Sequence, residues 1–213
     1  MGFVGEERLI ARIAALRQPG KRLVLAVVGA PGSGKSTIAE VIRDGLTKGG
    51  ISAEVLAMDG FHYDDAILNA RGIRARKGAP DTYDVAGFAA LLDRLRANTQ
   101  PDVAVPIFDR HMELSRNCAR LIPQETEVLV VEGNYLLLDL PGWRDLAPAF
   151  DLTVFLDIPA ELLRERLYAR WRYHGMAEAD IPAKIEGNDM PNGLTVINRS
   201  RKADITLSLA DLT

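Results

Sequence analysis

A glycine-rich segment that follows an apolar run constrains this sequence most strongly. It reads GAPGSGKST over residues 29–37 and comes directly after the apolar run 23–28. The spacing Gly29-x-x-x-x-Gly34-Lys35-Ser36 is the P-loop pattern. Glycines allow backbone conformations that are closed to other residues, and they let an anion approach the chain closely. The segment therefore predicts a strand, a phosphate-binding loop and a helix in succession.

The positions of this loop have distinct predicted tasks. Successive backbone amides and the positive end of the following helix are expected to cradle phosphate oxygens. Lys35 is predicted to reach the outer phosphates, and the Ser36 hydroxyl is predicted to ligate Mg²⁺. The expected nucleotide-binding residues are Gly29, Gly32, Ser33, Gly34, Lys35, Ser36 and Thr37. A nucleoside triphosphate with Mg²⁺ is therefore the expected ligand.

Length and composition narrow the class of protein. With 213 residues and 47% hydrophobic content, residues 1–213 are expected to form a single α/β domain. A formal net charge of −3 provides no overall positive field for nucleic acid or an anionic membrane. The single cysteine, Cys118, excludes an internal disulfide. Residues 5–9 are charged and the apolar run is too short to span a bilayer, so we expect a soluble cytoplasmic protein, monomer or homodimer, without nucleic-acid or membrane partners.

Hydrophobic periodicity predicts alternating helices and strands. Helices are predicted over residues 5–18, 38–46, 85–97 and 160–173, and strands over residues 23–28, 51–58, 103–108, 127–131, 152–156 and 204–209. Because Pro106 cannot donate a ladder hydrogen bond, we expect its strand to lie at a sheet edge or to contain a bulge. This order predicts a three-layer α/β/α sandwich with a mostly parallel sheet. The ligand site is then expected beyond the carboxyl ends of the strands.

Two carboxylates follow strands at this predicted edge. Glu132 ends the strand 127–131, and a carboxylate there is expected to hold Mg²⁺. Asp59 ends the strand 51–58 and is the candidate base for a hydroxyl that attacks a γ-phosphate. A solvated strand end and an Asp-Gly turn are the ordinary alternatives. The rivals of Asp59 in nearby loops are Asp64, Asp65, Asp81, Asp84 and Asp109.

The helix predicted over 160–173 is rich in arginine. Arg166 and Arg170 are four residues apart and share one face. We expect them to stabilise charge on a transferring phosphoryl group from a helical lid around residues 160–190. The alternative is a solvated basic face paired with Glu161 and Glu165. The three histidines lack metal-ligand spacing, so we do not expect zinc.

Several separate stretches together resemble the uridine kinase, pantothenate kinase and phosphoribulokinase family of P-loop kinases. The stretches are residues 29–37, 58–61, 76–84, 106–109, 131–133 and the arginine helix ending at 173–175. The resemblance implies an ATP-dependent kinase with Mg²⁺ and a small-molecule acceptor, in which Asp59 is the base. It also implies that the segments 77–84 and 108–116 line the acceptor pocket. The acceptor-binding residues that we infer from it are Asp59, His62, Tyr63, Lys77, Asp84, Asp109 and Arg116.

The sequence around residues 59–62, 71–72 and 77–80 looks most like bacterial proteins named "putative fructose transport system kinases", which implies a sugar acceptor such as fructose. A uridine/cytidine or pantothenate-type kinase is the alternative, although the uridine kinase pattern is only approximated at residues 108–116. Two alternatives belong to other functional classes: a nucleotide-binding regulator and an ATPase that acts on nucleic acid. Trp171 stands where relatives usually carry a charged residue, and the sequence offers only packing or stacking on the nucleotide as its role.

Overall fold

A five-stranded parallel sheet forms the centre of the computed structural model, which describes residues 5–212. Its strands are β1 (Leu23–Gly29), β2 (Ala53–Ala57), β5 (Val128–Gly133), β6 (Leu152–Asp157) and β7 (Ile205–Ser208). Their order is β2-β5-β1-β6-β7, and every neighbouring pair is parallel. The five carboxyl ends therefore meet at one edge of the sheet, where the site was predicted.

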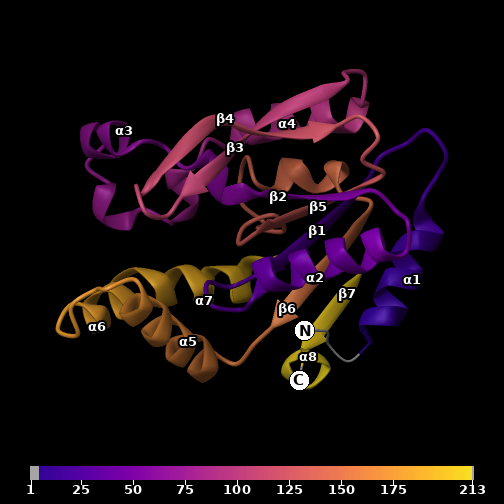
Figure 1. Cartoon of the computed structure of the whole chain (residues 1–213). Helices are drawn as coiled ribbons and strands as arrows, with labels where there is room; N and C mark the ends of the chain where they lie inside the picture. Colours follow the sequence, from indigo (N-terminus) through magenta and orange to yellow (C-terminus); the bar gives the residue numbers. More distant parts are fainter. Residues whose placement is uncertain (1–4, 213) are drawn as a thin grey trace.

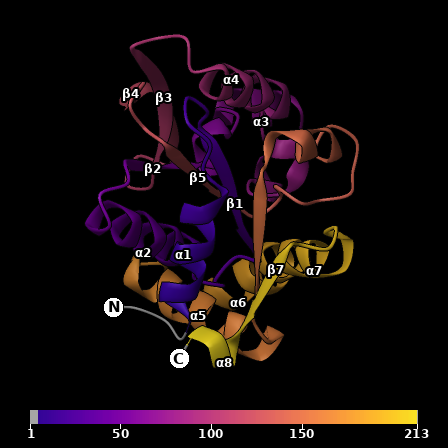
Figure 2. The same cartoon turned by 90° about the vertical axis from the view of Figure 1, so that its right-hand side faces the viewer.

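Helices cover both faces of this sheet (Figure 1). They are α1 (Glu6–Leu16), α2 (Lys35–Lys48), α3 (Asp65–Ala70), α4 (Val85–Ala97), α5 (Ala160–Tyr173), α6 (Ile181–Lys184), α7 (Met190–Arg199) and α8 (Leu209–Leu212), with a π-helical turn at Ile185–Asp189. Alternate residues of β1 enter two separate apolar clusters, one with α1 and α2 and the other with α4 and α7. Figure 2 shows α1 and α2 on one side of the sheet and α7 on the other. The predicted three-layer α/β/α sandwich is confirmed.

An antiparallel hairpin lies outside the main sheet. It consists of β3 (Asp102–Asp109) and β4 (Leu114–Pro123), and its register shifts between Val105 and Ile107. Pro106 lies at that shift, since proline cannot donate a ladder hydrogen bond. The prediction of an edge or bulge there is confirmed. Strand β4 was not predicted, because its sequence LSRNCARLIP has no regular alternation of apolar and polar residues.

Two predicted helices match the structure in both bounds, namely 85–97 (α4) and 160–173 (α5). The start of α4 is fixed by Asp84, whose side chain accepts a hydrogen bond of 2.9 Å from the Gly87 amide. The segment predicted as a lid comprises α5, α6 and the π-helical turn. Of the helices within residues 5–212, none has the length and apolar character needed to cross a membrane.

Candidate active site

The P-loop joins β1 to α2 and has the geometry of an anion-binding loop. Gly32 and Gly34 adopt φ values of +84° and +91°, which β-carbon-bearing residues rarely adopt. A Cβ placed on Gly29 would lie 2.5 Å from Ser33 Oγ, so the loop also needs glycine there for space. Helix α2 begins at Lys35, directly after the loop. The predicted succession of strand, loop and helix is confirmed.

Glu132 lies beside the P-loop because β5 pairs with β1, with Val27 opposite Glu132. Its Oε1 accepts a hydrogen bond of 3.0 Å from Ser36 Oγ, and its Oε2 lies 3.9 Å from Lys35 Nζ. Burial raises the pKa of Glu132, and the charge of Lys35 opposes that rise. The two residues predicted to hold Mg²⁺ are therefore in direct contact.

A hydroxyl and a carboxylate in contact supply the oxygen ligands that Mg²⁺ prefers. Residues 5–212 contain no group of three or more His, Cys, Asp or Glu side chains arranged to hold a metal ion. Ser36 and Glu132 would therefore hold Mg²⁺ together with phosphate oxygens of the nucleotide, which is how Mg²⁺ is usually bound. The residues present fit the ion that the P-loop implies.

Asp59 follows β2, the strand next to β5, in the short turn Met58–Phe61. Its Oδ1 accepts a hydrogen bond of 3.2 Å from the Tyr83 hydroxyl, and its Oδ2 accepts one of 2.7 Å from Arg110 Nη2. Burial alone raises the pKa of Asp59, but the positive charges of Lys35, Arg110 and Arg170 outweigh it and hold the pKa below the usual value. Asp59 is therefore an ionised carboxylate at neutral pH.

The rivals of Asp59 have local structural contacts. Asp64 accepts from the Ala66 amide and Asp84 from the Gly87 amide, so both cap helices. Asp109 accepts from the amides of His111 and Met112 and pairs with Arg116 at 3.3 Å. The other two rivals pair with cations: Asp65 with Arg74 and Lys77, and Asp81 with Arg76. Asp59 alone among these six lines the cavity described next.

A cavity of about 120 Å³ lies at the carboxyl edge of the sheet and brings distant segments together. Its lining residues are Pro31, Lys35, Asp59, His62, Arg74, Lys77, Gly78, Tyr83, Phe108, Arg110, Glu113, Asn134, Arg170, Trp171, Lys184, Asp189 and Asn192. Figure 1 shows α3 and the β3–β4 hairpin above this end of the sheet and α5 and α6 below it. The lining is rich in charged and polar side chains, which suits a polar ligand.

His62 forms one wall of the cavity. Its ring stacks on Tyr83 with 4.0 Å between centroids and lies 4.9 Å from the ring of Phe108. Burial lowers the pKa of His62 to about 4, although Asp59 acts in the opposite direction. His62 is therefore a neutral aromatic surface at physiological pH.

Lys77 is buried beside the cavity. Its ammonium donates to Asp65 Oδ1 at 2.7 Å and to the Glu113 carbonyl at 2.6 Å. The carbonyl of Lys77 accepts from Asn188 Nδ2 at 3.0 Å, which ties this loop to the π-helical turn. π-helical turns occur frequently at functional sites.

The arginines of α5 divide into two groups. Arg166 Nη1 donates to the P-loop carbonyls of Gly32 and Ser33 at 3.5 and 3.2 Å. Arg170 lines the cavity, where burial and the nearby charge of Arg110 lower its pKa. The remaining two are exposed and pair with Glu186 (Arg164) and Glu178 (Arg172). The alternative of a solvated basic face therefore holds for these two, but with partners other than Glu161 and Glu165.

Trp171 connects two helical segments. Its indole Nε1 donates to Asp189 Oδ2 at 2.6 Å, and its ring packs against a cluster that includes Ile181 and Ile185. The residue also lines the cavity. Packing is therefore one role of this tryptophan, as expected.

Four predicted acceptor ligands lie outside the cavity lining, namely Tyr63, Asp84, Asp109 and Arg116. The guanidinium carbon of Arg71 lies over the Tyr63 ring, 4.4 Å from the centroid of that ring. Their roles in acceptor binding stay predictions. The structure adds Arg110 and Lys184 to the cavity. Arg110 lies in the segment 108–116 that was predicted to line the acceptor pocket, and Lys184 lies in the predicted lid. Neither was singled out as a site residue, because only the folded hairpin and α6 bring these two side chains to the strand ends.

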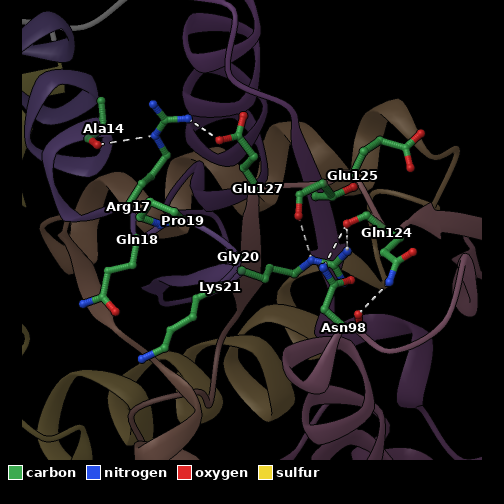
Figure 3. A pocket seen from close by; sticks show the side chains of 12 residues that line it. Ala14, Arg17, Gln18, Pro19, Gly20, Lys21, Asn98, Gln124, Glu125 and Glu127 are labelled. Carbon is green, nitrogen blue, oxygen red and sulfur yellow. Dashed lines mark hydrogen bonds and ion pairs between the residues drawn. The ribbon is translucent and has the colours of Figure 1, made fainter.

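A second cavity, of about 440 Å³, lies between the end of α1 and the segments that precede β1 and β5 (Figure 3). Arg17 is paired there with Glu127. The guanidinium of Arg22 donates to the carbonyls of Thr126, Leu95 and Pro123. These contacts satisfy the buried cation and fasten the amino ends of the strands. The residues of the P-loop are absent from this lining, so its greater volume does not make it the nucleotide site.

Together, a P-loop, a Ser–Glu pair beside it, an ionised aspartate and a half-buried arginine at one sheet edge define a P-loop kinase. The phosphoribulokinase/uridine kinase family model matches residues 24–209, and the chain belongs to this family. It is a small-molecule kinase with the fold of that family.

Individual relatives agree with this assignment. The chain is 33% identical over 208 residues to the uncharacterized protein YggC of Escherichia coli strain K12, covering 95% of this chain and 85% of that one. It is 28% identical over 202 residues to the putative uridine kinase C227.14 of Schizosaccharomyces pombe, covering 91% and 86%. The crystal structure of a putative fructose transport system kinase from Silicibacter sp. TM1040 superposes with a TM-score of 0.89 at 39% identity, covering 95% and 98%.

Proposed function

We propose that this protein is an ATP-dependent kinase that transfers the γ-phosphate to a hydroxyl of a small polar metabolite, with a sugar such as fructose as the first candidate. The observation that carries the proposal is the placement of the ionised Asp59 in one small cavity with Lys35 and Arg170. A base, a P-loop lysine and a half-buried arginine around one cavity are the parts that phosphoryl transfer to a hydroxyl needs.

In the proposed reaction the acceptor oxygen attacks the γ-phosphorus of ATP. The new bond joins that oxygen to the γ-phosphorus, the bond to the β,γ-bridging oxygen breaks, and ADP leaves. The acceptor proton passes to a carboxylate oxygen of Asp59, while the charge on the transferring group is stabilised by Lys35 and Arg170. His62 and Tyr83 keep the Asp59 side of the cavity aromatic and exclude water from it.

Ser36 and Glu132 are the proposed Mg²⁺ ligands. Bound Mg²⁺ would neutralise phosphate charge during transfer. The hydrogen bond of 3.0 Å between the two side chains holds both oxygens beside the P-loop in the structure. We propose ATP, Mg²⁺ and the small acceptor as the ligands, and the single exposed thiol of Cys118 suits the reducing cytoplasm as the compartment.

The sugar acceptor is supported by the description of the Silicibacter protein as a putative fructose transport system kinase. A nucleoside acceptor, suggested by the S. pombe putative uridine kinase, is the second candidate. A nucleotide-binding regulator would need neither an ionised base nor an arginine such as Arg170 beside the phosphate site. The contacts of Asp59 and Arg170 therefore favour an enzyme.

An ADP-release screen tests the proposal. Purified protein with ATP and Mg²⁺ is offered panels of sugars, sugar derivatives, nucleosides and vitamins, and acceptor-dependent ADP release is expected with at least one class. Lys35→Gln should lose this activity with every acceptor. The regulator reading gains support instead if ATP binds and no acceptor raises ADP release above the basal rate.

A further inference from the structure

Asn134 lines the cavity of the proposed kinase site. The residue is only 8% exposed, and its amide oxygen Oδ1 is a buried atom without a hydrogen-bond partner among residues 5–212. A buried amide without a partner costs folding free energy, because it has lost its hydrogen bonds to water. An unpartnered polar group of this kind in a cleft therefore indicates a ligand that completes its hydrogen bonds.

The other amide of the cavity lining already has a partner. Asn192 Nδ2 donates to Asn188 Oδ1 at 3.2 Å, and Asn188 Nδ2 donates to the Lys77 carbonyl at 3.0 Å. These bonds tie α7 and the π-helical turn to the segment before α4, which is a structural role. Within the described chain no such bond fixes the oxygen of Asn134. A rotation about its χ2 torsion can therefore turn either atom of the amide toward the cavity.

The end of β5 lies between the proposed base and the P-loop. Strand β5 pairs with β2 on one side and with β1 on the other. The register places Ala57 opposite Glu132, and Asp59 and Asn134 each lie two residues beyond this pair. On the other side, Gly133 pairs with the last residue before the P-loop. Neighbouring strands lie about 4.8 Å apart, so an acceptor that reaches from the base to the P-loop passes beside Asn134.

The residues on both sides of Asn134 are fixed in place. A Cβ on Gly133 would lie 2.5 Å from the Cβ of Met58, so the backbone there packs closely against the turn that follows β2. Tyr135 is fully buried, and its hydroxyl donates to the Gly78 carbonyl at 2.6 Å. The backbone therefore holds Asn134 in position before an acceptor binds, as a preorganised binding residue requires.

The chemistry of this amide matches a hydroxyl better than a phosphate. An amide has a donor nitrogen and an acceptor oxygen, and a hydroxyl both donates and accepts, whereas the phosphate oxygens of ATP only accept. A phosphate could bind Nδ2 but would leave Oδ1 without a donor. The attacking hydroxyl gives its proton to Asp59 and has no second hydrogen for Oδ1. The matching partner is therefore another hydroxyl of the acceptor.

We propose that Asn134 binds a second hydroxyl of the acceptor, one that is not phosphorylated, and thereby positions the attacking hydroxyl beside Asp59. The inference rests on the proposed kinase function and adds a specificity-determining residue to it. An acceptor without this hydroxyl leaves the amide unpartnered in the complex as well, so it should react less efficiently.

Monodeoxy acceptors test the proposal directly. ADP release with ATP and Mg²⁺ gives kcat/KM for D-fructose and for its monodeoxy analogues, or for the matching analogues of whichever acceptor the screen identifies. At least one analogue that keeps the phosphorylated hydroxyl should have a kcat/KM lower by about 10–100-fold, because it leaves a buried polar group unpaired. Equal values for all analogues that keep this hydroxyl would overturn the inference.

Variants assign the preference to Asn134. Asn134→Leu and the smaller Asn134→Ala should each reduce the ratio of kcat/KM for the acceptor to that for the deoxy analogue to within about threefold, with little change in the KM for ATP. Asn69→Ala, an exposed asparagine on α3, is the control and should keep the wild-type ratio. A ratio that stays at its wild-type value in both Asn134 variants would contradict the assignment, because both substrates would then be affected equally.

Thermal unfolding of the ligand-free protein gives a readout without turnover. Asn134→Leu should raise the Tm by about 2–4 °C, because methyl groups replace an amide that has no partner. The matched control is Asn188→Leu, since Asn188 is also 8% exposed but is hydrogen-bonded, and its Tm should fall. An equal fall in Asn134→Leu would overturn the inference, because the amide would then have a structural role.

Binding measurements separate this inference from the proposed function. With a non-hydrolysable ATP analogue and Mg²⁺, the panel compound that raises the Tm of the wild-type protein most should raise that of Asn134→Leu clearly less. If this difference is found but no compound releases ADP, the proposed function fails and the binding role of Asn134 stands. If ADP is released and Asn134→Leu keeps the full preference, the role of Asn134 fails and the proposed function stands.

Discussion

Arg110 Nη2 lies 2.7 Å from Asp59 Oδ2, which joins the turn of the β3–β4 hairpin to the carboxyl end of β2. This contact links two separate sheets, because β3 and β4 are not part of the parallel sheet. The arginine charge helps to hold the pKa of Asp59 below its usual value, so the carboxylate is ionised at neutral pH. The hairpin therefore contributes to the proposed chemistry as well as to the apolar cluster that contains residues of α4 and α7.

Asp59→Asn should reduce turnover by roughly a hundredfold or more, because an amide cannot accept the acceptor proton. The KM for ATP should change little, since the P-loop contacts remain. Steady-state ADP release at saturating acceptor measures both values. Asp93→Asn, an exposed carboxylate on α4, serves as the matched control and should behave as wild type. Unchanged turnover in the Asp59 variant would remove it from the role of base.

Glu132→Gln should raise the Mg²⁺ concentration for half-maximal activity by about tenfold, because a neutral amide binds a hard cation less well than a carboxylate. Chelation of Mg²⁺ should abolish activity in both proteins. The measurement is a titration of ADP release with Mg²⁺ at fixed ATP. Glu165→Gln, exposed on α5, provides the control. An identical Mg²⁺ dependence in the Glu132 variant would contradict its assignment as a ligand.

The sequence predicted the parts of this site that lie in chain order at strand ends. Asp59 and Glu132 follow neighbouring strands, and the register that pairs Ala57 with Glu132 brings them to one edge. The acceptor side was harder to predict because its cations come from loops and the short helix α6. Their positions depend on how the hairpin and the π-helical turn fold over the sheet, and neither β4 nor the π-helical turn has a periodic apolar signature.

The burial of His62 should make stability depend on pH. Its pKa is about 4 in the folded protein and about 6.5 in an unfolded chain, so the unfolded state binds more protons between these values. The free energy of unfolding should therefore be intact above pH 6.5 and fall by on the order of 3 kcal/mol as the pH drops to 4. His62→Gln should flatten this dependence in denaturant titrations at several pH values.

The control for this pH effect is His111→Gln, since His111 is exposed in the hairpin turn. This variant should keep the wild-type slope of stability against pH. A His62→Gln protein with the same slope as wild type would show that His62 is not the group that titrates.

Trp171→Phe should destabilise the protein by about 1–3 kcal/mol, because it removes the donor to the buried Asp189 and leaves that carboxylate unsatisfied. Asp189→Asn should lose less stability, since the amide oxygen can still accept the indole hydrogen bond. Chemical unfolding of both single variants and the double variant gives the coupling free energy between Trp171 and Asp189. Strictly additive losses would mean that the contact does not couple α5 to the π-helical turn.

Arg166 and Arg170 share a face of α5 but are expected to act differently in the reaction. Arg170→Gln should lower kcat by about 10²–10³-fold, because Arg170 lines the cavity where charge develops on the transferring group. Arg166→Gln should mainly raise the KM for ATP, because Arg166 contacts the P-loop carbonyls and not the cavity. Arg172→Gln is the matched control, since that side chain is exposed and paired with Glu178. Steady-state kinetics with ATP as the varied substrate distinguishes the two effects. A larger loss of kcat in the Arg166 variant than in the Arg170 variant would reverse the assignment and make Arg166 the arginine that stabilises the transferring phosphoryl group.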